Sequence, residues 1–366
     1  METKNRLTAP RTVLLTGGAG FIGINLCHYW IKQYPNDTLI ILDALTYAAN
    51  RTALQDLVTD KKIIFYEGCI QDTTYCEFLF AQHPITHVIH AAAESHVDRS
   101  ISDPDIFIKS NILGTHTLLT KAFKSWQMRK ILCPAQVRFH HISTDEVYGS
   151  LNLQDSKFTE ETPYDPKSPY SASKAASDHL VRAMGHTYGL PFTISNCSNN
   201  FGPYQHTEKL IPHMILKAIQ GEKMPVYGKG KNIRDWLYVE DHCRAIDLIL
   251  SKATPGETYL IGAENEWDNL SLVQKISEEL KLATLNNPTL KNYFPGLDFF
   301  LTLSEHDQIT FVQDRPGHDF RYAINPQKIQ SLGFKTIYSF EKCLQATIKW
   351  YLDFFAQRKP TSRIAS

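Results

Sequence analysis

Short apolar runs alternate with longer amphipathic stretches through the first half of the chain. Runs bounded by turn residues predict strands, whereas apolar residues spaced three and four apart predict helices. The predicted strands are 12–16, 38–42, 62–66, 87–91, 137–143 and 192–195. Because helical patterns separate most of them, we expect an α/β fold with a doubly wound parallel sheet. Ligands bind such sheets at the carboxyl ends of the strands.

The second half of the chain loses this regularity. Proline, glycine and aromatic residues are frequent in 200–236, and NNP, FPG and RPG interrupt a long stretch, 284–320, that we expect to be irregular. The amphipathic run 239–251 predicts a helix that returns to the first domain. We therefore predict a cofactor-binding domain of residues 1–195, rejoined by about 237–263. A smaller α/β substrate-binding domain is predicted from 196–236 and 264–366.

Composition and charge exclude several classes of protein. Hydrophobic residues make up 43% of the chain and charged residues 21%, as in globular domains rather than disordered or fibrous ones. Lys+Arg and Asp+Glu both number 38, so no overall field favours nucleic acid or an acidic membrane. Seven scattered cysteines without a C-x-x-C pair argue against disulfides and structural zinc, and favour the cytoplasm. The polar start METKNRLTAP and the lack of a ~20-residue apolar run predict no targeting or membrane segment.

A glycine-rich turn follows the first predicted strand. Gly17, Gly20 and Gly23 stand in TGGAGFIG, which opens a predicted helix. Glycines let the backbone approach a pyrophosphate, and the amino end of the helix offers N–H groups to it. Asp43 lies twenty residues beyond Gly23, at the end of the second predicted strand. A carboxylate there binds ribose hydroxyls and repels a 2′-phosphate, so the pattern favours NAD over NADP.

The chain contains three Tyr-x-x-x-Lys pairs, and only one fits a catalytic pair. The pairs are Tyr170/Lys174, Tyr227/Lys231 and Tyr338/Lys342. At the second pair, the two glycines in YGKGK disfavour the helix that would bring Tyr227 and Lys231 together. The third has no strand end before it and indicates the start of an exposed helix.

The pair Tyr170/Lys174 follows Pro169 in an alanine-rich run that ends at Gly189, which predicts one helix with both side chains on a single face. The strand upstream ends in Ser143 and Thr144. A lysine ammonium beside a phenol favours the phenolate and makes tyrosine a usable base near neutral pH.

These motifs together resemble the extended short-chain dehydrogenase/reductase superfamily, which has a Rossmann-like fold. Further segments are similar to the dTDP-glucose 4,6-dehydratase family: HAAAESHVDRSI, ISTDEVYGS, SPYSASKAASDHLVRA, NCSNNFGPYQHTEKLIP, PVYGKGKNIRDWLYVEDH and DRPGHDFRYAI. The similarity runs from about residue 12 to about residue 324. Asp145 and Glu146 directly after Thr144 are its discriminating feature, because most superfamily members lack two acids at this strand end.

The resemblance implies a lyase that converts dTDP-glucose to dTDP-4-keto-6-deoxyglucose and feeds deoxysugar biosynthesis, rhamnose for example. Tyr170 would take the 4-hydroxyl proton while hydride leaves carbon 4 for NAD, with Lys174 and Thr144 assisting. Glu146 would then remove the carbon 5 proton, and Asp145 would protonate the leaving 6-hydroxyl. The hydride returns to carbon 6, so NAD is regenerated.

The resemblance also implies binding residues and a homodimer. The implied NAD-binding residues are Gly17, Gly20, Phe21, Ile22, Gly23, Asp43, Leu45, Thr46, Ile70, Ala91, Ala93, Tyr170 and Lys174. The implied substrate-binding residues are His96, Asn196, Glu208, Lys209, Leu210, Tyr227, Arg234, Asn269, Arg315 and His318. No metal is expected, because the neighbouring His140 and His141 point to opposite sides of a strand.

Some positions depart from the family pattern, and two alternatives stay open. Cys69 stands where an Asp usually meets the adenine, Ala44 and Ala49 replace a Lys and a Gly beside the ribose, and 284–312 is longer than usual. One alternative is a sister nucleotide-sugar dehydratase or epimerase with a UDP-linked substrate, although an epimerase needs no acid pair after Thr144. The other is a non-catalytic NAD-binding regulatory protein.

Overall fold

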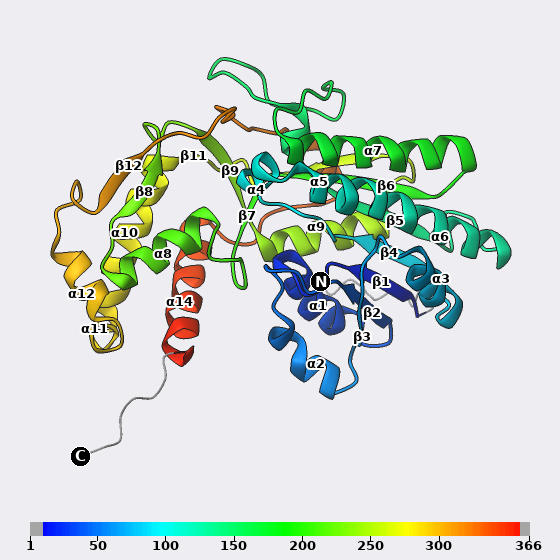
Figure 1. Ribbon diagram of the computed structural model, residues 1–366, viewed down its shortest axis with the longest axis horizontal. Helices are drawn as coiled ribbons and strands as arrows, with labels where there is room; N and C mark the ends of the chain where they lie inside the picture. The colour runs from blue at the N-terminus through cyan, green and yellow to red at the C-terminus, as the bar shows by residue number, and fades with distance from the viewer. Residues whose placement is uncertain (1–9, 359–366) are drawn as a thin grey trace. The chain divides into compact units, whose positions relative to one another are not determined.

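Seven strands form the main sheet in the computed structural model of the chain, which describes residues 10–358 (Figure 1). The strands, in their order across the sheet, are β10 (Thr258–Ile261), β6 (Phe192–Cys197), β5 (Arg138–Thr144), β4 (His87–His90), β1 (Thr12–Thr16), β2 (Thr38–Asp43) and β3 (Ile64–Glu67). The pairs β1·β2, β1·β4, β2·β3 and β4·β5 are parallel. The predicted Rossmann-like sheet is confirmed, and its strand order reverses direction between β1 and β4.

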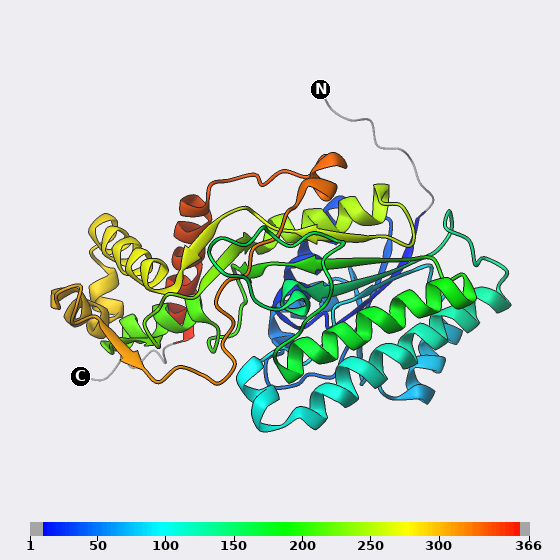
Figure 2. The ribbon, with the colours of Figure 1, turned by 90° about the horizontal axis from the view of Figure 1, so that it is seen from above.

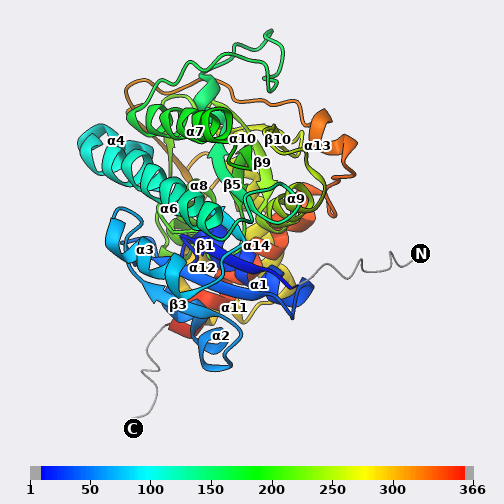
Figure 3. The same cartoon turned by 90° about the vertical axis from the view of Figure 1, so that its right-hand side faces the viewer.

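Helices cover both faces of this sheet and bury its apolar strands. On one face α3, α6 and α7 pack next to one another (Figures 2 and 3). Tyr29 of α1 and Tyr34 just beyond it both donate hydrogen bonds to Asp247 at the carboxyl half of α9. The helical elements are α1 (Phe21–Gln33), a 3-10 turn (Arg51–Leu54), α2 (Gln55–Thr59), α3 (Thr73–Gln82), α4 (Val97–Ser102), α5 (Pro104–Phe107), a π-helical segment (Ile108–Gly114), α6 (Thr115–Met128), a 3-10 turn (Asp145–Tyr148), α7 (Pro169–Tyr188) and α9 (Val239–Lys252).

The second half of the chain builds a separate core from helices and two small sheets. Helices α8, α10, α12 and α14 enclose an apolar cluster that includes Phe294, Leu297 and Phe300. One sheet has the order β11-β9-β7, and in the other β12 pairs in parallel with β8. The elements are β7 (Asn199–Phe201), α8 (Leu210–Gln220), β8 (Met224–Tyr227), β9 (Ile233–Tyr238), β11 (Glu266–Asp268), α10 (Asn269–Asn286), α11 (Leu290–Tyr293), α12 (Pro295–Thr302), β12 (Ile309–Val312), α13 (Gln327–Ser331) and α14 (Phe340–Arg358).

The chain divides into two compact units whose limits differ from the predicted domain limits. Unit 1 runs through Val147 and continues with Ser168–Asn196 and Ile246–Tyr259, and unit 2 comprises Tyr148–Lys167, Cys197–Ala245 and the chain from Leu260 onward. The segment that returns to unit 1 is therefore shorter than 237–263. The loop 148–167, expected in the first domain, belongs to unit 2, where Phe158 donates its N–H to Ala323.

The stretch expected to be irregular, 284–320, is partly regular. It contains α11, α12 and β12, and β12 pairs with β8 from Ile309↔Met224 to Val312↔Tyr227. The NNP, FPG and RPG sequences separate these short helices and the strand but do not prevent their formation. The polar start of the chain lies outside the described residues, except Pro10. Among the helices within 10–358, none is both long and apolar enough to cross a membrane.

Candidate active site

The glycine-rich turn packs so closely against other backbone that a side chain at Gly17 or Gly23 would collide with it. Gly17 has φ +72°, and a Cβ there would lie 2.7 Å from Cα of Ala92. A Cβ on Gly23 would lie 2.2 Å from the carbonyl oxygen of Gly17. Helix α1 begins at Phe21, so its first amide groups have no partner within the helix. The turn therefore has the shape and the donors that a dinucleotide phosphate requires.

Asp43 ties this turn to the end of β2. Its carboxylate accepts hydrogen bonds from the N–H groups of Ala19 and Leu45, both at 2.8 Å. Burial raises the pKa of Asp43, and the two backbone hydrogen bonds oppose that rise. Leu45 has φ +50°, which turns the chain sharply after the strand. Each carboxylate oxygen can accept further hydrogen bonds, so the site fits a ribose hydroxyl as well.

The other predicted NAD-binding residues lie at nearby strand ends in unit 1. Ala91 follows β4 and donates its N–H to Thr16 at 3.2 Å. Ile70, after β3, is buried, whereas Thr46 and Ala93 are exposed. These positions belong to the same carboxyl edge of the sheet because β2, β3 and β4 run parallel to β1 or to each other. NAD would supply a hydride acceptor and donor at this edge.

The acidic pair lies directly after β5. The strand ends at Thr144, and the 3-10 turn that follows carries Asp145 and Glu146. Thr144 Oγ1 donates to Asp145 Oδ1 at 3.4 Å and accepts the N–H of Glu146 at 3.3 Å. Asp145 is 1% exposed, while Glu146 is half-buried. Two adjacent carboxyl groups thus lie in different environments, which suits different proton-transfer roles.

Helix α7 places Tyr170 and Lys174 against β5. A capping box between Ser168 and Ser171, with Pro169 as first helical residue, fixes where the helix begins. Both side chains are at least nine-tenths buried. Lys174 Nζ donates to the carbonyl of Ile142 on β5 at 2.8 Å. The predicted pair therefore lies one helix turn apart on the helix face that packs against the strand carrying Thr144.

Sequence reasoning missed two buried residues behind this pair. His141 Nε2 is 3.5 Å from Lys174 Nζ and 3.2 Å from Asp178 Oδ1, and neither His141 nor Asp178 exposes its side chain. Asn196, predicted to bind substrate, donates to Asp178 Oδ2 and to the Thr144 carbonyl. The available signal was the four-residue spacing of Tyr170, Lys174 and Asp178, which places all three on one helix face.

In unit 2 the structure brings five predicted substrate-binding residues together: Tyr227, Arg234, Asn269, Arg315 and His318. The rings of Tyr227 and His318 meet edge to face at 6.3 Å. Burial lowers the pKa of His318, and the charges of Arg315 and Arg234 lower it further. Asn269 donates its N–H to the Asn232 carbonyl, two residues before Arg234. Two guanidinium groups beside an aromatic ring are suited to a diphosphate attached to a base.

Arg234 and the predicted substrate residues outside this group contact residues of their own unit or begin a helix. His96 caps α4 by accepting the N–H of Arg99 at 3.3 Å. Glu208 lies 3.6 Å from His206, and Lys209 and Leu210 begin α8. The guanidinium of Arg234 donates to the carbonyls of Ile233 and Asp319 and lies over the Tyr322 ring.

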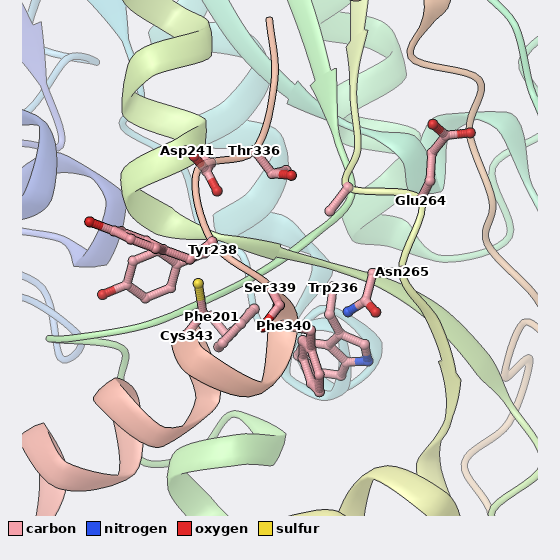
Figure 4. Close-up of a pocket in the computed structure, with 12 residues that line it drawn as sticks. Phe201, Trp236, Tyr238, Asp241, Glu264, Asn265, Thr336, Ser339, Phe340 and Cys343 are labelled. Atoms are coloured by element: carbon pink, nitrogen blue, oxygen red, sulfur yellow. The ribbon is translucent and has the colours of Figure 1, made fainter.

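Unit 2 also contains a cavity that none of the predicted residues lines. It measures about 190 Å³ and is formed by aromatic side chains such as Phe201, Trp236 and Phe340 together with Asp241 and Asn265 (Figure 4). Within residues 10–358, no three His, Cys, Asp or Glu side chains are grouped so that they could hold a metal ion.

Comparisons with known proteins find similarity over nearly the whole chain. The family described as GDP-mannose 4,6 dehydratase matches residues 14–347. A dTDP-glucose 4,6-dehydratase of Neisseria gonorrhoeae is 48% identical over 98% of this chain and 99% of its own. The same enzyme of Haemophilus influenzae is 47% identical, over 93% and 97%.

The chain belongs to the dTDP-glucose 4,6-dehydratase family.

A solved structure of this family has the same fold as this chain. The dTDP-glucose 4,6-dehydratase of Streptomyces venezuelae, solved with NAD bound, is 37% identical and superimposes with a TM-score of 0.82. The superposition covers 95% of this chain and 99% of that one. The predicted resemblance to the dTDP-glucose 4,6-dehydratase family is therefore confirmed, and so is the extended short-chain dehydrogenase/reductase fold.

Proposed function

We propose that this chain is an NAD-dependent lyase that dehydrates dTDP-glucose to dTDP-4-keto-6-deoxyglucose. One juxtaposition carries the proposal. Asp145 and Glu146 directly follow β5, and Lys174 packs against the same strand, its Nζ 2.8 Å from the Ile142 carbonyl oxygen. A tyrosine–lysine pair serves oxidation of an alcohol. An acid and a base beside it serve the removal of water from the ketone that results.

Each side chain has a stated proton to hold or move. Tyr170 takes the proton of the sugar 4-hydroxyl, and the ammonium of Lys174 stabilises its phenolate. Glu146, half-buried, takes the carbon 5 proton, which the 4-ketone has made acidic, and gives a proton back to carbon 5 when the hydride adds to carbon 6. Asp145, buried, gives its proton to the departing 6-hydroxyl. NAD, held by the glycine-rich turn and Asp43, would supply the hydride acceptor for carbon 4 and the hydride donor for carbon 6 of the same sugar.

Unit 2 supplies the groups that we propose bind the nucleotide. Arg234 and Arg315 offer charged donors to the diphosphate, and the Tyr227 ring offers a face to the pyrimidine. Tyr227 is 42% exposed, so its ring is accessible to a ligand. Glu208, Lys209, Leu210, Asn269 and His318 of unit 2, with His96 and Asn196 of unit 1, complete the proposed set.

The acidic pair also separates this proposal from the alternatives. An epimerase returns the hydride to carbon 4 and needs no acid for a leaving hydroxyl, so Asp145 would have no task. A non-catalytic NAD-binding protein would need neither carboxyl group. The UDP-linked dehydratase shares the chemistry and differs only in the nucleotide.

We expect turnover of dTDP-glucose with loss of one water and without net formation of NADH. The thymine methyl in an apolar pocket favours dTDP-glucose over dUDP-glucose by ~1–3 kcal/mol, roughly 10–200-fold in kcat/KM. Mass spectrometry on dTDP-, dUDP- and UDP-glucose, with absorbance of NADH, measures both effects. NADH formed in proportion to product would contradict the lyase, and equal kcat/KM for all three sugars would contradict only the nucleotide assignment.

We propose a cytoplasmic homodimer. The seven cysteines are free thiols, which supports a reducing compartment.

Ile101, Ile108 and Leu113 are each more than 40% exposed on α4 and the π-helical segment, which supports coverage by a second copy of this chain. Sedimentation velocity at micromolar concentration should give a dimer for the wild type and a monomer for Leu113→Glu. Leu153→Glu, on the 62%-exposed Leu153 of unit 2, is the control and should stay dimeric.

A further inference from the structure

Lys174 lies in a buried polar cluster that contains one carboxylate. Its ammonium donates to the Ile142 carbonyl and lies 3.5 Å from His141 Nε2. The same nitrogen of His141 lies 3.2 Å from Asp178 Oδ1. The side chains of His141 and Asp178 are entirely buried, and Lys174 is 4% exposed. A buried ammonium requires an opposite charge, because burial alone penalises its charged form.

The charges of the cluster identify Asp178 as that opposite charge. Burial and, after it, the neighbouring Lys174 ammonium lower the pKa of His141 to about 4 although Asp178 opposes this, so the ring is neutral at pH 7. The pKa of Asp178 is lowered although burial opposes this, because His141, Lys174 and Arg182 all favour its carboxylate. Near neutral pH the cluster therefore pairs one ammonium with one carboxylate.

Several hydrogen bonds hold that carboxylate in a single orientation. Ser143 Oγ donates to Asp178 Oδ2 at 2.9 Å, and Asn196 Nδ2 donates to the same oxygen at 3.2 Å. Ser143 immediately precedes Thr144, and Asn196 also bonds to the Thr144 carbonyl. The carboxylate is thus fixed to the same strand end that carries the acidic pair.

We propose that Asp178, through His141, is a positioning residue for the catalytic lysine: it fixes the Lys174 ammonium beside Tyr170 and keeps it charged. The proposal rests on the proposed function, since it concerns the oxidation step. Other ionisable groups around the cluster are Tyr170 and Arg182 on α7 and His90 on β4, whose ring lies 5.1 Å from that of His141. The pKa of His90 is well below its usual range because of burial, so His90 adds no positive charge at neutral pH.

The test is the pH profile of Asp178→Asn, which keeps the shape of the side chain and removes its charge. Without the carboxylate the ammonium of Lys174 loses its proton more readily. We expect the alkaline limb of kcat to move to lower pH by about 1 unit, the effect of one opposite charge nearby. Above the pH of the wild-type limb kcat should fall by up to about 10-fold, while KM for dTDP-glucose changes by less than about 3-fold.

His140→Gln is the matched control. His140 immediately precedes His141 on β5 and is equally buried, but its ring forms hydrogen bonds with Thr193 and Ser195. It should keep the wild-type alkaline limb. Circular dichroism and NAD binding establish that each variant is folded. If Asp178→Asn does not fold, His141→Asn removes the ring between the two charges and should move the limb in the same direction.

The outcomes separate two failures. If the alkaline limb is unchanged in folded Asp178→Asn, the positioning role is contradicted. The same holds for His141→Asn where that variant is the test. Normal wild-type turnover would still uphold the proposed function. A wild-type enzyme that turns over no sugar nucleotide would contradict the proposed function itself. An equal shift in His140→Gln would show that any change in this strand moves the limb, and would also overturn the inference.

Discussion

Replacement of Tyr170 by phenylalanine is expected to reduce hydride transfer to NAD by about 10²–10⁴-fold, the usual contribution of a general base. The change removes one oxygen and keeps the ring, which packs edge to face against Phe107 at 6.3 Å. Fold and NAD binding should therefore persist. Rapid-mixing absorbance of NADH with one equivalent of dTDP-glucose measures the step directly.

A matched control for this variant is Tyr227→Phe in unit 2. It also removes one phenol oxygen, from a ring that we propose only binds the pyrimidine. We expect a change mainly in KM and a nearly normal rate of hydride transfer at saturation. Normal hydride transfer by Tyr170→Phe would show that another group takes the hydroxyl proton.

Single replacements of the two acids after β5 should block the reaction at different steps. Glu146→Gln should still reduce NAD, because oxidation at carbon 4 precedes its task, but carbon 5 should no longer exchange its hydrogen with deuterated water. Asp145→Asn should keep that exchange and slow the loss of water instead. Each change should cost overall turnover about 10²–10⁴-fold.

Deuterium content at carbon 5, followed by mass spectrometry or NMR, distinguishes these roles. The structure gives a physical reason for the division: Asp145 is 1% exposed, whereas Glu146 is half-buried at the end of the same strand. If Asp145→Asn abolished exchange and Glu146→Gln preserved it, the two roles would have to be interchanged. If either variant kept full turnover, that carboxyl group would have no role in the reaction.

Local patterns in the sequence were sufficient for six strands of the main sheet and for the helix of the Tyr170/Lys174 pair, whereas β10 was not predicted. Strand β1 has the predicted limits, 12–16, and α7 begins at Pro169 and ends before Gly189, which has φ +70°. Turn residues, capping residues and apolar periodicity act over a few residues, so they can be recognised without the fold. The strand ends that carry Asp43, Thr144 and Ala91 follow from the same patterns.

Tertiary structure decided what depends on residues far apart in the chain. Pairing of β12 with β8 joins Val312 to Tyr227, and it gives order to a stretch whose own sequence contains several breakers. Asp178 resembles any polar residue of a surface helix until the fold buries it against His141. The sequence by itself predicted six strands of the sheet, the glycine-rich turn and the proposed residues of the reaction. Burial and contacts between distant segments determined which charges surround Lys174, because both arise only when the chain packs.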